Sequence, residues 1–230
     1  MMNDPRHSHL DTPSSPPSTL NPRHSPTVFI VDDDASVRKA LTRLIKSAGY
    51  ETQAFISARE FIDTHVHASD PACLVLDVRM PGLTGLDLQS ELQKRNFILP
   101  IIFITGHGDI PMSVQAMKAG AVDFLPKPVH EKTLLPAIEQ ALVRASRQQI
   151  AATELEGIRG RLDSLTPRER EVMELVVTGM LNKQIAHKLG TVEKTIKVHR
   201  ARVMDKMVVD SLAALVRLAE KVGIPQRKVQ

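Results

Sequence analysis

The chain has 230 residues, of which 42% are apolar, 24% are charged and one is a cysteine. This length suits two domains, and the composition excludes collagen-like, fully disordered and disulfide-stabilised proteins. The net charge of +4 is uneven, because residues 149–230 carry 15 Lys and Arg against 10 Asp and Glu. That region could bind a polyanion, or it could simply present a charged helical surface.

No uninterrupted apolar stretch reaches the length of about 18 residues that a transmembrane helix needs. The N-terminus also lacks the apolar core of a signal peptide. We therefore expect a soluble, cytoplasmic protein that does not act at a membrane. Residues 1–26 hold six Pro and five Ser among few apolar residues, which predicts a disordered N-terminal extension.

Residues 27–145 alternate apolar, β-branched runs with amphipathic segments, which predicts five strands and five helices in one domain. Runs without polar alternation indicate parallel strands covered on both faces, and hence a doubly wound α/β fold. The predicted strands are 27–31, 51–55, 72–76, 101–104 and 122–125, and the predicted helices are 35–48, one after Ser57, 84–95, one from about 111 to 120, and one from about 131. Pro136 is expected to kink or delay the last of these helices.

A polar, helical segment at 146–164 is predicted to link this domain to an all-α domain at 165–230. Four helices are predicted there, at 167–178, 183–189, 192–207 and 211–222. Thr166 and Glu169 match a capping box, with Pro167 at the first helical position. Gly190 separates two short helices, and Thr191 is expected to cap the second of them. Two helices around a glycine turn predict a helix-turn-helix unit.

Charged and hydroxyl side chains follow the predicted strands of the first domain: Asp32, Asp33 and Asp34 follow the first strand, Asp77 the third, Thr105 the fourth and Lys127 the fifth. Because the carboxyl ends of parallel strands share one edge of a sheet, we expect these side chains to converge. Clustered carboxylates stay ionised beside a cation, and hard oxygen ligands favour Mg²⁺. The cluster therefore indicates phosphoryl transfer with Asp77 as the acceptor, although each residue alone could be a helix cap or a surface residue.

Four segments along this domain together resemble the receiver domain of two-component response regulators: VDDD (31–34), LVLDVRMPGLTG (74–85), FITGHGD (103–109) and DFLPKP (123–128). The stretch 103–128 is similar to the FixJ subgroup in particular. The resemblance implies the flavodoxin-like strand order 2-1-3-4-5 and implies that Asp77 is the phosphoacceptor. It implies that Asp32 and Asp33 form the acidic pair, and that Asp33, Asp77 and the backbone carbonyl of Arg79 bind Mg²⁺.

The same resemblance implies that Lys127 forms a salt bridge with the phosphoryl group and that Thr105 turns its hydroxyl towards it. Phe124 would rotate inward as part of a two-state switch, although an aromatic residue on a strand could equally be ordinary core. Asp34 lies one place beyond the acidic pair and is expected to cap the first helix instead.

The predicted helix 192–207 has two distinct faces. Val192, Ile196, Val203 and Met207 share one face and are expected in the core, whereas Lys194, Lys197, Val198 and Ala201 form an outward face that suits a DNA major groove. Lys183, Lys188, Arg200 and Arg202 are expected to contact phosphates, which positions a protein without specifying sequence. A charged helix that merely faces solvent is the alternative.

Three segments of the second domain resemble the LuxR-type output domain: LTPREREV (165–172), TGMLNKQIA (178–186) and TVEKTIKVHRARVMDKM (191–207). The resemblance implies base contacts from Lys197, Val198 and Ala201, and a backbone contact from Thr195. It also implies that helix 211–222 pairs two output domains on DNA, unless that helix only completes the core.

Taken together, the two resemblances lead us to expect a transcriptional response regulator that a sensor histidine kinase phosphorylates on Asp77. Phosphorylation would form a homodimer through residues 111–126, which would bind double-stranded promoter DNA and contact RNA polymerase. A turnover enzyme is not expected, although the protein could remove its own phosphoryl group. Two alternatives are a Mg²⁺-dependent phosphohydrolase, which would need a substrate pocket, and a constitutive DNA-binding protein with a vestigial receiver.

Overall fold

The structure, a computed structural model, describes residues 26–64, 70–106 and 110–224. Apart from Pro26, the predicted disordered extension lies outside the described residues. The chain forms two compact units, divided between Arg147 and Gln148. Among the described helices, none combines the length and the apolar character needed to cross a membrane.

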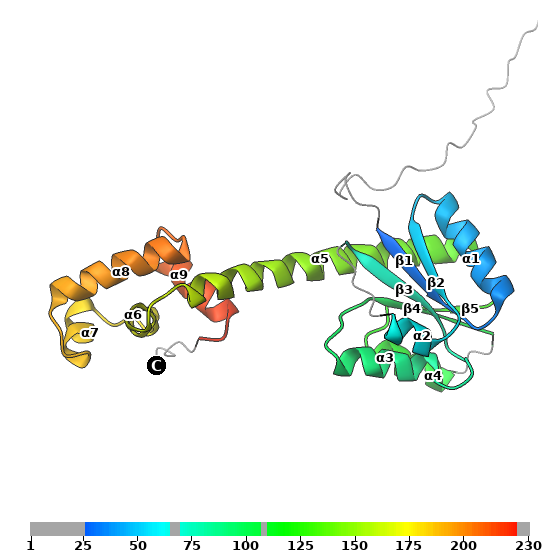
Figure 1. The fold of residues 1–230 in the computed structure, drawn as a ribbon, viewed down its shortest axis with the longest axis horizontal. Helices are drawn as coiled ribbons and strands as arrows, with labels where there is room; N and C mark the ends of the chain where they lie inside the picture. The colour runs from blue at the N-terminus through cyan, green and yellow to red at the C-terminus, as the bar shows by residue number, and fades with distance from the viewer. Residues whose placement is uncertain (1–25, 65–69, 107–109, 225–230) are drawn as a thin grey trace, which may run out of the picture. The chain divides into compact units, whose positions relative to one another are not determined.

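Five strands form the centre of the first unit: β1 (Thr27–Val31), β2 (Glu51–Phe55), β3 (Ala72–Asp77), β4 (Ile101–Thr105) and β5 (Asp123–Pro126). They build a parallel sheet in the order β2-β1-β3-β4-β5 (Figure 1). The predicted doubly wound fold and its strand order are therefore confirmed. In the central strand β3, every residue is buried, which explains why its sequence is apolar without alternation.

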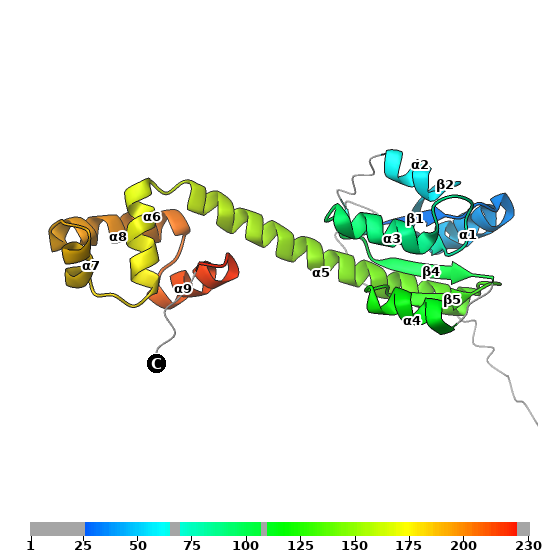
Figure 2. The same cartoon turned by 90° about the horizontal axis from the view of Figure 1, so that it is seen from below.

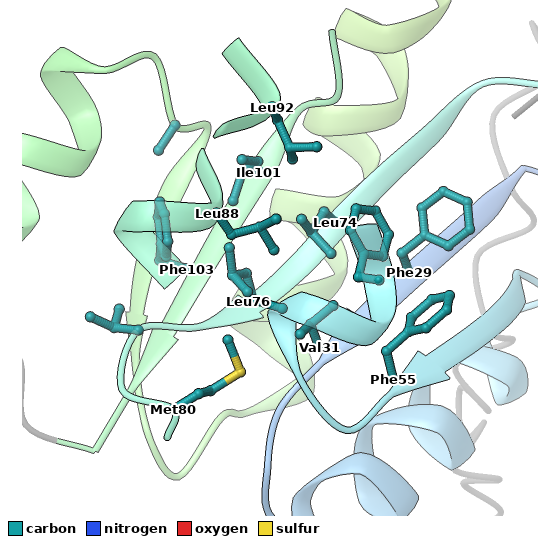
Figure 3. Close-up of a cluster of buried hydrophobic side chains, with 14 of the residues drawn as sticks. Phe29, Val31, Phe55, Leu74, Leu76, Met80, Leu88, Leu92, Ile101 and Phe103 are labelled. Atoms are coloured by element: carbon teal, nitrogen blue, oxygen red, sulfur yellow. The ribbon is translucent and has the colours of Figure 1, made fainter. Parts of the chain in front are cut away.

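Two layers of helices cover the sheet. The helices of this unit are α1 (Ala35–Ser47), α2 (Ala58–Asp63), α3 (Gly85–Lys94), α4 (Ile110–Lys118) and the first half of α5 (Glu131–Asp163). α2, α3 and α4 pack on one face around Phe29, Leu74 and Phe103 (Figure 3). α1 and α5 pack on the other face, against the side chains of the same strands that point the opposite way.

α5 runs without interruption through Pro136, so the expected delay of this helix is wrong. Proline removes one backbone donor, at a cost of about 3 kcal/mol inside a helix. Leu134, Ile138 and Leu142 on the same helix are almost fully buried against the sheet. Burial of three such side chains stabilises the helix by roughly 5 kcal/mol or more, which outweighs the proline.

The second unit contains α6 (Pro167–Val177), α7 (Asn182–Lys188), α8 (Glu193–Met207) and α9 (Leu212–Lys221), packed together with the last turns of α5 (Figure 2). Ile158 and Leu162 of α5 are buried in its core. The capping box at the start of α6 is confirmed, with Pro167 in the first turn.

The start of α8 differs from the prediction. Val192, not Thr191, is the N-cap, and no side chain caps this end of the helix. Val192 is also 64% exposed, whereas Ile196 and Met207 are fully buried. An N-cap residue has extended backbone angles and lies outside the helical repeat, so its side chain does not share the core face of the helix.

Candidate functional site

The ends of β1, β3, β4 and β5 bring the predicted acidic cluster together. Asp32 directly follows β1 and is fully buried, and Asp77 is the last residue of β3. The Nζ of Lys127 lies 2.7 Å from Oδ2 of Asp32 and 3.2 Å from Oδ2 of Asp77. The cation therefore bridges two carboxylates that are 50 residues or more from it in sequence.

Opposing effects set the pKa values of Asp77 and Lys127 in this bridge. Burial raises the pKa of the Asp77 carboxyl, the neighbouring ammonium of Lys127 lowers it, and the charge of Asp32 raises it again, so that the pKa ends above its usual value. Burial alone would lower the pKa of Lys127, but its hydrogen bonds and ion pairs with the two carboxylates raise it. The ammonium of Lys127 thus offsets part of the repulsion between the two carboxylates.

A metal ion fits the cluster. Carboxylate oxygens of Asp32, Asp33 and Asp77 lie within 4.8 Å of one another, and Asp33 is exposed to solvent. Several oxygen ligands with one side open to solvent match the preference of Mg²⁺, which keeps some of its water. Arg79 follows closely after β3, and its backbone N–H donates to the Asp77 carboxylate.

Asp34 has the separate role that was predicted for it. Its Oδ1 accepts hydrogen bonds from the backbone N–H of Ser36 at 2.7 Å and of Val37 at 3.4 Å, which caps α1. These bonds, with one from the Ser36 hydroxyl, lower the pKa of Asp34. The cap directs α1 away from the end of β1 and leaves Asp32 and Asp33 at the sheet edge.

Sequence reasoning missed the role of Gly85, which begins α3. A Cβ at this position would collide with the backbone carbonyl of Asp77, and the Gly85 N–H donates to the carbonyl of Val78 at 3.0 Å. Only glycine allows the loop after β3 to return this closely to the strand. The glycine thereby fixes the backbone of the candidate acceptor, and no signal in the sequence distinguishes it from an ordinary turn glycine.

Thr105 and Phe124 lie on neighbouring strands beside the cluster. Thr105 ends β4, is almost completely buried, and its carbonyl accepts the N–H of Lys127 at 2.7 Å. Phe124 is half-buried on β5, where it pairs in register with Phe103, their ring centroids 6.2 Å apart. The backbone bond joins the end of β4 to Lys127, and the ring pair joins β4 to β5 two residues before Thr105.

The face of α8 that is predicted to contact DNA is exposed to solvent. Lys194, Lys197, Val198, Ala201 and Arg202 are exposed on α8, Thr195 is half-buried, and Lys183 and Lys188 are exposed on α7. The Nζ of Lys197 lies 3.0 Å from Oε1 of Glu193, one turn earlier. Both side chains are largely solvent-exposed, so the pair is weak and can open for another partner.

Arg200, which was predicted to contact a DNA phosphate, also has a hydrogen-bond partner within its own unit. It is half-buried, and its guanidinium donates to Oδ1 of Asn182 at 3.2 Å, which joins α8 to α7. Arg168 of α6 similarly donates to the carbonyl of Leu189 at the end of α7, at 2.7 Å. Both arginines hold the helix-turn-helix geometry, a role that neither spacing nor charge indicated.

Comparisons with known proteins identify the families of both units. The family described as "Response regulator receiver domain" matches residues 28–139, and "Bacterial regulatory proteins, luxR family" matches residues 163–219. Nodulation protein W of Bradyrhizobium diazoefficiens is 50% identical over 197 residues, which cover 86% of each chain. The transcriptional regulatory protein FixJ of the same organism is 43% identical over 197 residues, 86% of this chain and 96% of FixJ.

Among solved structures, the response regulator StyR is similar to this chain with a TM-score of 0.76 and 49% sequence identity. The similarity covers 86% of this chain and all of the StyR chain.

Proposed function

Because the chain belongs to the response regulators that join a receiver domain to a LuxR-type DNA-binding domain, we propose that phosphorylation of Asp77 controls its binding to DNA. The bridge that Lys127 makes to Asp32 and Asp77 is the observation that carries this proposal. It places a fixed cation beside the one acidic side chain that ends β3.

The phosphoryl donor is a phosphohistidine of a sensor histidine kinase. An Oδ of Asp77 attacks the phosphorus, the P–N bond breaks as the new P–O bond forms, and the imidazole leaves and takes up a proton. Lys127 neutralises charge on the transferred group, and the hydroxyl of Thr105 turns to donate to one of its oxygens. When bound at Asp33, Asp77 and the carbonyl of Arg79, with Asp32 alongside, Mg²⁺ supplies further charge neutralisation. Attack by water on the same phosphorus breaks its bond to Asp77, releases inorganic phosphate and resets the switch.

In this switch, phosphorylation changes the partners of the side chains around Asp77. A phosphoryl group on Asp77 attracts Lys127, which in this structure is shared with Asp32. Thr105 moves with it, and the half-buried ring of Phe124 turns into the space that Thr105 vacates. The surface between residues 111 and 126 then forms a homodimer.

The dimer presents two helix-turn-helix units to promoter DNA. Lys197, Val198 and Ala201 contact base edges, while Thr195 and the basic residues of this surface contact the backbone: Lys183, Lys188, Lys194, Arg200 and Arg202. α9 pairs the two helix-turn-helix units of the dimer. Leu215 and Ala219 are fully buried in the core of their own unit, so the half-buried Leu212 and Val216 make this contact. Bound at a promoter, the dimer contacts RNA polymerase.

Light scattering with Mg²⁺ and beryllium fluoride, which stands in for the phosphoryl group, tests this proposal. The wild type should change from monomer to dimer when beryllium fluoride is added, and Asp77→Asn should stay monomeric. Dimerisation of both proteins would contradict control through Asp77, and dimerisation of neither would contradict dimerisation as the means of control.

A further inference from the structure

α4 is fixed only weakly by its own apolar residues. Within this helix, all of whose residues are described, Ala116 alone is buried. Ile110 is 79% exposed, Val114 is 44% exposed and Met117 is 45% exposed. A helix that buries so little apolar surface needs other contacts to hold its position.

Side chains from two other helices supply these contacts at the C-terminal end of α4. Gln89 of α3, which is only 4% exposed, donates from Nε2 to the carbonyl of Ala119 at 3.3 Å. Gln93, one turn later on α3, donates to the same carbonyl at 2.6 Å. Arg144 of α5 donates to the carbonyl of Gly120 at 3.1 Å.

The end of α4 is also closed by two backbone hydrogen bonds of its own. The N–H of Gly120 bonds to the carbonyl of Met117 at 2.9 Å, and that of Ala121 to the carbonyl of Ala116 at 3.1 Å. Gly120 has a φ of 87°, so the helix ends in a complete Schellman motif. The donors from α3 and α5 bind two other carbonyls, those of Ala119 and Gly120, so they add hydrogen bonds that tie the end of α4 to its neighbouring helices.

We propose that Gln89, Gln93 and Arg144 form a latch that holds α4 in the unphosphorylated arrangement and loosens when Asp77 is phosphorylated. The inference rests on the proposed function, in which the face that includes α4 rearranges. Contacts made in one of two states shift the equilibrium between them by their interaction free energy. Removal of the latch therefore favours the activated arrangement, and by reciprocity a phosphoryl analogue must bind more tightly by the same factor.

The test measures the affinity of the full chain for beryllium fluoride in the presence of Mg²⁺, by ¹⁹F NMR at concentrations where the protein is monomeric. The latch variant is Gln93→Ala/Arg144→Ala, because both side chains are exposed and their loss leaves the core intact. Arg147→Ala is the matched control, since it removes the same charge from an exposed position further along α5. The latch variant should bind the analogue roughly tenfold more tightly, as expected from the loss of two hydrogen bonds, and the control should match wild type.

Gln89→Leu, which keeps most of the buried volume, should tighten binding in the same direction. Latch variants that bind like Arg147→Ala, or more weakly, would overturn the latch, and a lower melting temperature with unchanged affinity would show a purely structural role. If wild type binds no analogue, or if Asp77→Asn binds it equally, the proposed function and the latch both fail. If wild type binds it through Asp77 and the latch variants bind no better, the latch alone fails.

Discussion

The turn after α8 places a valine in a backbone conformation that valine rarely adopts. Val208 caps α8 with φ 55° and ψ 54°, in the left-handed region. A residue with a Cβ pays about 1–2 kcal/mol there, and β-branching puts valine at the upper end of that range. Because the side chain is 72% exposed, it recovers little of this cost through packing.

Val208→Gly should therefore stabilise the C-terminal unit. The substitution removes a strain of about 2 kcal/mol. The greater freedom of glycine in the unfolded chain costs about 0.5–1 kcal/mol, and the lost contacts of a mostly exposed side chain cost about 0.3 kcal/mol. The net gain is about 1 kcal/mol, which raises the melting temperature of a unit of this size by about 4–8 °C.

Scanning calorimetry of the full chain, with and without Mg²⁺, measures this gain. The transition that Mg²⁺ leaves unchanged belongs to the C-terminal unit, because the carboxylate cluster lies in the other one. Val208→Ala keeps the Cβ but loses the branch, so it should gain less than glycine, and Val208→Asn should lie between alanine and glycine. Glycine and alanine variants that melt at the same temperature would refute the strain argument.

Three further substitutions or conditions test other parts of the structure. Val192→Ser should stabilise the C-terminal unit by about 1 kcal/mol, because it supplies the missing cap of α8; a calorimetric midpoint equal to that of wild type would contradict this. Gly85→Ala should destabilise the receiver by about 1–3 kcal/mol through its collision with the Asp77 backbone, and analogue binding should weaken with it; unaltered binding would count against the role of this glycine. Hydrogen bonds from Lys206 and the backbone of Thr166 lower the pKa of Glu169 from 4.5 to about 2. Stability of the C-terminal unit should thus be fully present above pH 4.5 and fall between there and about pH 2, and Glu169→Gln should lack this dependence in an acid titration of the melting temperature.

The sequence predicted the parts of the fold that local pattern determines. Unbroken apolar runs identified β1, β3 and β4, and their regular alternation with helices predicted a doubly wound parallel sheet, whereas the strand order followed from the resemblance to receiver domains. The first residue of α8 was misplaced because Thr191 is a preferred N-cap residue and Val192 is a poor one, yet the backbone angles make Val192 the N-cap. The delay predicted at Pro136 was wrong because the burial of apolar side chains elsewhere on α5 stabilises the helix by more than the proline costs.

The sequence did not predict the hydrogen bonds between side chains and the ends of neighbouring helices. The acidic cluster was foreseen, since the carboxyl ends of parallel strands must meet at one edge. By contrast, the hydrogen bonds from Gln89 and Arg144 to the end of α4 join residues 24 or more positions apart. Nothing in the spacing of these side chains marks them, because they depend on how three helices pack.

The central claim is that the chemical state of Asp77 sets the affinity for DNA. Fluorescence anisotropy tests it most directly, with a labelled duplex selected from random sequence by the activated protein, and with Mg²⁺ present throughout. Beryllium fluoride should raise the affinity of the wild type by roughly tenfold or more, in the usual range of coupling between two sites, and should leave Asp77→Asn unchanged. Equal affinity of the two proteins in the presence of beryllium fluoride would contradict the account.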